Sequence, residues 1–269
     1  MILFPNCKIN IGLNIIRKRP DGYHDLESVF YPIPLKDIIE IVPAESFQFN
    51  ISSGSIPGDH LNNSCVKAYQ YLKEAFPDLP GVNMYLYKNI PTGAGLGGGS
   101  ADGAFMLRLL NDKFNLNLTT DQLIDYALRI GSDSPFFILN KPAFVSGRGE
   151  YIEHFPLDLS LHTFVLVHPG IHISTSWAFS KIKPGKPGQP LREILQQPIK
   201  TWQHLLTNDF ETPVFTAYPF LSDIKKKLYE SGALYASMTG SGSSFYGVFE
   251  KNAVPSFSYD PNFRVDILK

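Results

Sequence analysis

The sequence predicts a globular protein of mixed helices and strands that is long enough for two modest domains. Three observations carry this prediction: a length of 269 residues, a composition of 43% hydrophobic against 18% charged residues, and apolar residues whose spacing changes between the periods of a strand and of a helix. A chain of this length and composition buries a full hydrophobic core and is not disordered.

Strands are expected where apolar and polar residues alternate. Residues 8–15 alternate in this way, and the turn sequence Arg19-Pro20-Asp21-Gly22 predicts that a second strand pairs with them. Residues 143–145 and 151–152 predict a hairpin around Gly147-Arg148-Gly149. Further strands are expected at residues 82–87, 162–168 and 245–249.

Helices are expected over residues 62–76, over residues 101–114 and from Thr120 to Arg129, where apolar residues recur at helical spacing. Ser100-Ala101-Asp102 is expected to cap the second helix and Thr120 the third. Residues 181–190 contain three lysines, three prolines and two glycines, and they predict a mobile surface loop.

The most informative segment is the run from Pro91 to Asp102, which has five glycines in seven positions. A glycine within regular structure costs roughly 0.5–1 kcal/mol, so this density predicts a loop with unusual dihedral angles or bare amides. The loop follows a predicted strand and leads into a predicted helix, whose N-terminal amides and dipole favour an anion. This order of strand, loop and helix predicts a cradle for phosphate.

Other glycine-loop motifs fit this segment less well. Gly93-x-Gly95-x-x-Gly98 satisfies a dinucleotide pattern, but the acidic residue expected about 20 positions later is missing. No lysine follows the last glycine, as a Walker loop requires, and the chain has no His-Arg-Asp or Asp-Phe-Gly motif of a protein kinase. A tight turn that binds nothing is the structural alternative for the loop alone.

The formal net charge of −1 gives no field that would gather nucleic acid or hold an anionic membrane, so neither is an expected partner. The chain begins without a signal-like segment, and no stretch approaches the roughly 18 apolar residues of a membrane span, so we expect a soluble, cytoplasmic protein. Cys7 and Cys65 are too few for a disulfide framework or a metal cluster, and we expect both to be buried apolar residues.

Three further segments carry side chains that packing does not require. Lys8 and Asn10 lie in the apolar N-terminal strand, Asp133 lies between two serines, and residues 238–245 form a second loop of glycines and hydroxyl residues. Each segment has a structural alternative: a solvent-facing lysine, a helix cap and a tight turn, respectively.

The chain resembles the superfamily of galactokinase, homoserine kinase, mevalonate kinase and phosphomevalonate kinase, the GHMP kinases. Three motifs in the right order carry this resemblance: Lys8-Ile9-Asn10, Pro91-x-Gly93-x-Gly95-Leu96-Gly97-Gly98-Gly99-Ser100-Ala101 and Thr239-Gly240-Ser241-Gly242. Two more segments resemble the branch that phosphorylates 4-diphosphocytidyl-2-C-methyl-D-erythritol in non-mevalonate isoprenoid biosynthesis: Pro20-Asp21-Gly22-Tyr23-His24 and Gly131-Ser132-Asp133-Ser134-Pro135-Phe136-Phe137. The resemblance spans residues 5 to about 250.

The resemblance implies a two-domain α+β fold, with an N-terminal half like the second domain of ribosomal protein S5 and a ferredoxin-like C-terminal half. We expect residues 1–153 to form the ATP-binding and catalytic domain and residues 154–269 to form the C-terminal domain. The implied reaction moves the γ-phosphoryl group of ATP to the 2-hydroxyl of the small-molecule substrate. ATP implies Mg²⁺, whose ligands the sequence does not indicate, and we expect a monomer or a homodimer.

The resemblance also implies roles for individual residues. Asp133 is expected to be the general base, Lys8 to hold it ionised and to stabilise charge on oxygen, and Asn10 to orient the substrate. Asn63 and Lys88 match positions near the nucleotide. The phosphate cradle is expected to comprise Pro91, Gly93, Gly95, Leu96, Gly97, Gly98, Gly99, Ser100 and Ala101.

A cytidine pocket is expected around two residues after the first turn. Tyr23 would stack on the pyrimidine and His24 would hydrogen-bond to its edge, whereas the structural alternative is a packed aromatic residue beside a satisfied histidine. Phe30, Thr175 and Phe179 match positions that line the same pocket.

One position, Gly103, departs from the family pattern. It stands where alanine is common and is expected to loosen the helix by up to about 1 kcal/mol.

Two other functions stay open. A sibling kinase for homoserine or mevalonate would not need Tyr23 and His24, and a requirement for cytidine in the substrate distinguishes the two kinases. A non-catalytic nucleotide or ligand sensor of the same fold would not need both Lys8 and Asp133.

Overall fold

The structure is a computed structural model that describes residues 1–52, 62–253 and 260–269. It divides the chain into two compact units. The first unit comprises Met1–Cys7, Pro34–Thr92 and Gly97–Lys141, and the second comprises Lys8–Ile33, Gly93–Leu96 and Pro142–Lys269. Each compact unit is made of several separate segments of the chain. The predicted boundary between residues 153 and 154 stays a prediction.

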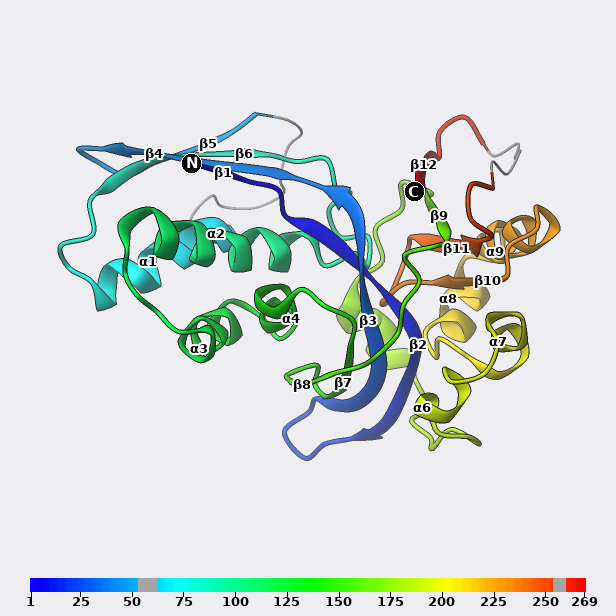
Figure 1. Cartoon of the computed structure of the whole chain (residues 1–269). Coiled ribbons are helices and arrows are strands. Elements are labelled where there is room, and N and C mark those ends of the chain that lie inside the picture. The colour runs from blue at the N-terminus through cyan, green and yellow to red at the C-terminus, as the bar shows by residue number, and fades with distance from the viewer. Residues whose placement is uncertain (53–61, 254–259) are drawn as a thin grey trace. The chain divides into compact units, whose positions relative to one another are not determined.

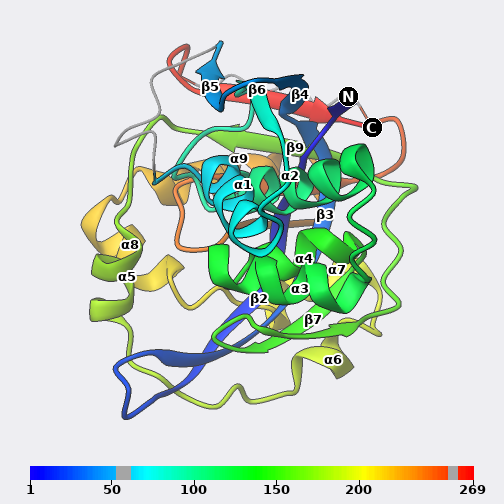
Figure 2. The ribbon, with the colours of Figure 1, turned by 90° about the vertical axis from the view of Figure 1, so that its left-hand side faces the viewer.

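The first unit contains a four-stranded sheet covered by helices. Its strand order is β1 (Ile2–Leu3), β4 (Ile38–Ala44), β6 (Gly81–Tyr87) and β5 (Gln48–Ile51), and β5 runs parallel to β6 while the other pairs are antiparallel. Helices α1 (Ser64–Ala75) and α2 (Gly98–Phe114) lie along one face of this sheet (Figure 1). Helices α3 (Thr120–Ile130) and α4 (Ser134–Leu139) lie beyond them (Figure 2).

Gly103 allows α1 and α2 to pack closely together. A Cβ at this position would lie 2.9 Å from the Cβ of Ser64 on α1 and 3.1 Å from Cγ2 of Ile130 at the end of α3. Real Cβ atoms essentially never approach to 2.9 Å, so a larger residue would push the helices apart. The glycine that departs from the family pattern therefore has a packing reason.

Gly103→Ala is expected to lower the free energy of unfolding by about 1–2 kcal/mol, because the cost of overpacking exceeds the gain of up to about 1 kcal/mol in helix propensity. Chemical denaturation of the two proteins measures the difference. Gly185→Ala is the matched control, since nothing lies within 4 Å of a Cβ there. A Gly103→Ala protein that is as stable as the wild type would contradict the packing explanation.

The second unit contains most of the long strands β2 (Asn6–Lys18) and β3 (His24–Lys36). With β7 (Ala143–Gly147) and β8 (Tyr151–His154) they form a four-stranded sheet in the order β2-β3-β7-β8. A second sheet has the order β10 (Tyr235–Met238), β11 (Phe245–Phe249), β9 (Thr163–His168) and β12 (Arg264–Leu268), with antiparallel neighbours throughout. The helices of this unit are α5 (Thr175–Lys181), α6 (Leu191–Ile194), α7 (Ile199–Leu205), α8 (Glu211–Ala217) and α9 (Leu221–Glu230).

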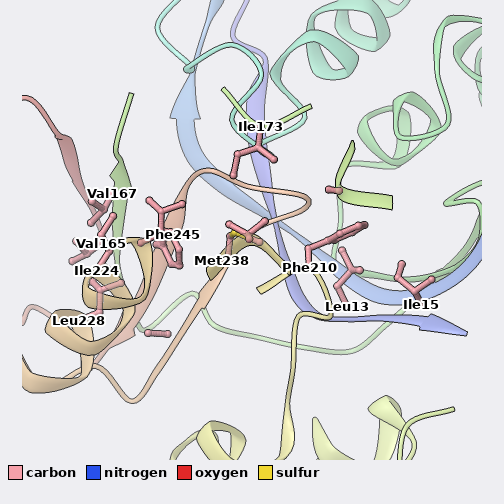
Figure 3. Packing of buried hydrophobic residues seen from close by; sticks show 14 of the residues in the cluster. Leu13, Ile15, Val165, Val167, Ile173, Phe210, Ile224, Leu228, Met238 and Phe245 are labelled. Carbon is pink, nitrogen blue, oxygen red and sulfur yellow. The ribbon is translucent and has the colours of Figure 1, made fainter. Parts of the chain in front are cut away.

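One hydrophobic cluster joins the second sheet to its helices and to the C-terminal half of β2. Val165 of β9 and Phe245 of β11 pack with Ile224 and Leu228 of α9, as Figure 3 shows. The same cluster extends through Met238 and Phe210 to Leu13 and Ile15 of β2. Burial of these side chains holds β2 against the C-terminal part of the chain.

Most of the predicted elements are confirmed, including the strand pair β2–β3, the hairpin β7–β8 and the first three helices. Two predicted caps are wrong. Helix α2 begins at Gly98 rather than at residue 101, because Gly97 adopts a left-handed conformation (φ 70°) and is itself the N-cap, without a side-chain hydrogen bond. Helix α3 is capped by Thr119, whose hydroxyl accepts a hydrogen bond from the amide of Gln122, and not by Thr120.

Candidate active site

The first part of the glycine-rich loop, Gly93–Leu96, belongs to the second unit, where it packs against the loop after β10. A Cβ on Gly95 would lie 2.1 Å from the carbonyl oxygen of Thr239, and Gly95 has a φ of +79°. A Cβ on Gly93 (φ +68°) would lie 2.8 Å from Nδ1 of His172. Both positions therefore favour glycine for conformation, and Gly95 also requires it for space, because its contact is with backbone.

Lys8 is buried beside this loop at the centre of a polar network. Its Nζ donates hydrogen bonds to Oδ1 of Asn10 at 2.5 Å and to the carbonyl oxygen of Gly95 at 3.3 Å, and it lies 4.5 Å from the centroid of the Phe30 ring. The amide of Lys8 also donates to the carbonyl oxygen of Leu96 at 3.0 Å. A solvent-facing lysine, the structural alternative for Lys8, is excluded, because the residue is only 3% exposed.

Asn10 links this lysine to the loop after β10. Its backbone amide donates to Oγ1 of Thr239 at 3.1 Å, and its side-chain Nδ2 donates to Oγ of Ser28 at 2.9 Å. The Oγ1 of Thr239 donates in turn to the carbonyl oxygen of Gly95 at 3.2 Å. The hydroxyl of Tyr246, whose pKa is raised by burial, stays protonated and donates to the carbonyl oxygen of Asn10 at 2.8 Å. These bonds fix which way the Asn10 amide points and hold the Lys8 ammonium in place.

The three motifs that were far apart in the sequence thus meet, in part, within one unit: Lys8 and Asn10, Gly93–Leu96 and Thr239–Gly242. Thr239 lies in one of the three motifs, but the sequence assigns it no role; its place in the motif is the signal that could have identified it as a site residue. Ser28 was not predicted as a site residue, and nothing in the local sequence marks it.

Two of the residues predicted for a cytidine pocket, His24 and Phe179, contact each other in the second unit. The rings of His24 and Phe179 are stacked, with centroids 5.0 Å apart and an interplanar angle of 22°. Thr175 lies one helical turn before Phe179 on α5, and its hydroxyl is 3.1 Å from that of Ser241. Tyr23 is 55% exposed, and the guanidinium carbon of Arg148 lies 4.2 Å from the centroid of its ring.

The protonation of His24 suits recognition of a neutral base. Burial, and then the charge of Lys18, lower the pKa of His24, so that the imidazole is neutral at neutral pH. A neutral imidazole has one donor and one acceptor nitrogen, as the edge of cytosine has both kinds of group. Phe30, which was assigned to the same pocket, lies under Lys8 and is buried.

The remaining glycines of the loop belong to the first unit and form the start of α2. The amide of Ala101 donates to the carbonyl oxygen of Gly97 at 2.9 Å, so the amides of Gly98, Gly99 and Ser100 precede the first α-helical hydrogen bond. Pro91 ends the segment that leads into the loop from β6. Free amides at the end of a 17-residue helix are the arrangement that binds phosphate elsewhere.

Asp133 lies in the same unit, directly before α4. It occupies the N-cap position of α4 but makes no side-chain capping bond, so the helix-cap alternative does not account for it. A Cβ on Gly131 would lie 3.8 Å from Oγ of Ser100, which places the segment before Asp133 beside the first turn of α2. Lys8 belongs to the other unit, and the joint action of Lys8 and Asp133 is part of the proposal below.

Asn63 and Lys88, the two residues expected near the nucleotide, both have structural partners. Oδ1 of Asn63 accepts a hydrogen bond from the amide of Cys65 at 2.9 Å and caps α1. Lys88 bonds to the carboxylates of Asp37 and Asp102, at 2.7 Å in the case of Asp102. Sequence reasoning missed this role of the two aspartates.

A cavity of about 970 Å³ in the second unit is lined by Trp177, by residues of the loop at 181–190 and by α8. The amide of Gly185 in this loop donates to the carbonyl oxygen of Ile15 at 3.0 Å. None of the predicted site residues lines this cavity, so its size alone does not make it the active site.

No group of three or more His, Cys, Asp or Glu residues that could hold a metal ion occurs in the part of the chain that the structure describes. Over the same residues, no helix is long and apolar enough to cross a membrane.

Comparison with known proteins gives the class of this site. Residues 63–141 match the family "GHMP kinases N terminal domain" and residues 191–258 match "GHMP kinases C terminal". A crystal structure of mevalonate kinase superposes with a TM-score of 0.71 over 99% of this chain and 98% of its own, at 12% identity, which supports the fold alone. The fold and the glycine-rich loop together define a GHMP kinase, a small-molecule kinase of two α+β domains, as the sequence predicted.

More similar relatives narrow the class. A 4-diphosphocytidyl-2-C-methyl-D-erythritol kinase of Bacteroides fragilis is 53% identical over 93% of this chain and 92% of its own. A crystal structure of 4-(cytidine 5'-diphospho)-2C-methyl-D-erythritol kinase is 30% identical, with a TM-score of 0.80 over 92% of this chain and 90% of that one. The chain belongs to the 4-diphosphocytidyl-2-C-methyl-D-erythritol kinase family of the GHMP kinases.

Proposed function

We propose that the protein transfers the γ-phosphoryl group of ATP to the 2-hydroxyl of 4-diphosphocytidyl-2-C-methyl-D-erythritol. The observation that carries this proposal is 53% identity, over nearly the whole chain, to a relative with that name. Homoserine and mevalonate kinases share only the fold, at 15% and 12% identity, so the sibling kinases are the weaker candidates. A non-catalytic sensor is a weaker candidate still, because it would not need the buried hydrogen bonds that hold Lys8 and Asn10 in place.

In this proposal Asp133 accepts the proton of the 2-hydroxyl as the phosphoryl group arrives. The Lys8 ammonium, fixed by Asn10 and by the carbonyl oxygen of Gly95, stabilises the negative charge that develops on oxygen. The reaction needs little covalent chemistry from the protein, so positioning of the two substrates and electrostatic stabilisation supply most of the rate.

The phosphate chain of ATP would be bound by the amides of the glycine-rich loop and the N-terminus of α2, with Asn63 and Lys88 supporting the segments beside them. Mg²⁺ would arrive with ATP and neutralise charge on the phosphate oxygens. We place the reaction in the cytoplasm, catalysed by a monomer or a homodimer.

Cytosine would be recognised by Tyr23, His24, Thr175 and Phe179. The exposed ring of Tyr23 offers a stacking face, and the neutral His24, held by its stack on Phe179, offers hydrogen bonds. Phe30 would contribute through its contact with Lys8 rather than through the base.

An acceptor panel tests the proposed function. The purified protein is given magnesium-ATP with the cytidylyl substrate, with mevalonate or with homoserine, while ADP release and product mass are followed. ADP release and a one-phosphate mass gain with the cytidylyl substrate alone are expected. Turnover of mevalonate or homoserine instead would leave only the wider class, and ATP binding without turnover of any acceptor would favour a sensor.

His24→Ala is expected to raise KM for the cytidylyl substrate at least about tenfold while KM for ATP stays within about twofold, because a lost specific hydrogen bond costs about 1–3 kcal/mol. Steady-state kinetics with each substrate varied in turn measures the split. His204→Ala on α7, an exposed histidine, is the matched control and should change neither constant. Equal effects of His24→Ala on both KM values would argue against a cytosine pocket.

A further inference from the structure

Three charged side chains are buried together in the first unit, between the sheet and α2. Nζ of Lys88 bonds to Oδ2 of Asp37 and, at 2.7 Å, to Oδ2 of Asp102. The side chains of Lys88, Asp37 and Asp102 are 9%, 0% and 4% exposed, respectively. Two carboxylates thus share one ammonium, and the group carries a buried net negative charge when both carboxylates are ionised.

This cluster, Asp37-Lys88-Asp102, is attached to both ends of the glycine-rich loop. Oδ1 of Asp37 accepts hydrogen bonds from the amides of Asn89 at 2.5 Å and Ile90 at 2.7 Å, just before the loop. Asp102 lies on α2, just after it. A Cβ on Gly98 would lie 3.3 Å from Nζ of Lys88 and 2.9 Å from Cγ2 of Ile90. The cluster therefore lies directly behind the first amides of α2.

The position of the excess negative charge matters for anion binding. The N-terminus of α2 has no acidic residue in its first turn, so its positive end is available to an external anion. Oδ1 of Asp102 is buried and has no hydrogen-bond partner among the described residues, so this carboxylate is the incompletely satisfied member of the cluster. A bound phosphate chain and an ionised Asp102 would place two anions at one helix end, and they would repel each other.

We propose that Asp102 is a positioning residue that takes up one proton from solvent when the phosphate chain of a nucleotide binds at the N-terminus of α2. Protonation leaves Lys88 and Asp37 as a neutral pair, so the cluster keeps its hold on the loop while the repulsion disappears. The proposal rests on the proposed function only in that this helix end binds the phosphate chain.

The groups that face Asp102 are consistent with such a proton. Burial raises the pKa of Asp102, the charge of Lys88 lowers it and the charge of Asp37 raises it again, with a result of about 7. Burial lowers the pKa of Lys88, but the two carboxylates more than offset this, so the lysine stays charged. The thiol of Cys65 on α1 is buried, which raises its pKa and keeps it neutral. Asp37 accepts two amide hydrogen bonds besides the ammonium, whereas Oδ1 of Asp102 has no partner among the described residues, so Asp102 is the carboxylate that we assign the proton to.

Calorimetry of nucleotide binding tests the proposal. MgADP is titrated into the protein at about pH 8, where most of Asp102 is ionised in the free protein, in buffers of different ionisation enthalpy. The slope of the observed enthalpy against the buffer ionisation enthalpy gives the number of protons taken up. We expect close to one proton per nucleotide for the wild type and close to none for Asp102→Asn. Asp112→Asn, an exposed residue near the other end of α2, is the matched control and should behave as the wild type.

The same linkage predicts a pH profile that a merely structural role would not produce. The dissociation constant of MgADP should rise by up to about tenfold per pH unit above the pKa of Asp102 in the wild type and stay flat in Asp102→Asn. If Asp102→Asn does not fold, the carboxyl carbon of Asp102 in ¹³C-aspartate-labelled wild type gives the answer directly. Its titration midpoint should lie near 7 in the free protein and move upward with MgADP.

The outcomes separate this proposal from the proposed function. Binding of MgADP with no proton uptake, or with equal uptake by the wild type and Asp102→Asn, would overturn the role of Asp102 and leave the kinase function standing. An NMR midpoint that does not move with MgADP would do the same. A protein that binds no nucleotide and turns over no acceptor would overturn both proposals.

Discussion

Asp133→Asn is expected to reduce turnover of the cytidylyl substrate at least about 10²-fold, which is the scale of general-base removal, and to leave nucleotide binding nearly intact. The amide has the size of the carboxylate but cannot accept the proton of the 2-hydroxyl. The side chain makes no capping bond to α4, so the substitution does not remove a cap from this helix. We therefore expect the loss to appear in kcat.

Steady-state kinetics, calorimetric titration with MgADP and thermal denaturation of the same preparation measure the three quantities. Asp125→Asn, an exposed residue on α3, makes the same change of charge in the neighbouring helix and should leave all three unchanged. An Asp133→Asn protein with wild-type turnover would remove Asp133 from its assigned role.

Gly95→Ala is expected to reduce the free energy of unfolding by at least about 3 kcal/mol, through left-handed strain and overpacking together. The new Cβ would lie 2.1 Å from the carbonyl oxygen of Thr239, and one of the two backbone segments must move. The carbonyl oxygen of Gly95 accepts hydrogen bonds from Lys8 and Thr239, so this movement should also reduce kcat/KM.

Gly170→Ala separates the two causes. Gly170 has a φ of +75°, close to the +79° of Gly95, but nothing lies within 4 Å of a Cβ there. This control should cost only about 1–2 kcal/mol, the strain of the left-handed conformation, and leave kcat/KM unchanged. Equal losses of stability in the two variants, measured by chemical denaturation, would show that the contact with Thr239 contributes nothing.

Features of the site that depend on local residue types could be predicted from the sequence. The glycine density between Pro91 and Asp102 predicts unusual backbone dihedral angles, and Gly93, Gly95 and Gly97 adopt positive φ values. Alternation of apolar and polar residues predicts the strands before and around this loop. The exact start of α2 could not be predicted from side-chain caps, because the N-cap is a left-handed glycine, Gly97, that makes no side-chain hydrogen bond.

Features that depend on long-range contacts could not be predicted. Asp37 lies 51 residues from Lys88 and Thr239 lies 229 residues from Asn10, and nothing near either residue indicates its partner. Asp102 resembled a helix cap because it follows Ser100, whereas its carboxylate bonds to Lys88. Gly103 looked unfavourable by helix propensity alone, since the close approach of α1 that explains it is a tertiary contact.

The measurement that tests the central claim most directly is the ³¹P NMR spectrum of the product formed from magnesium-ATP and 4-diphosphocytidyl-2-C-methyl-D-erythritol. Transfer to the 2-hydroxyl predicts one new phosphomonoester signal beside the retained diphosphate signals. This signal should be unsplit, because the tertiary carbon that carries the new ester has no hydrogen. A new ester signal split by protons on its carbon would place the phosphate on another hydroxyl, and ADP formation without any new ester signal would contradict the kinase function itself.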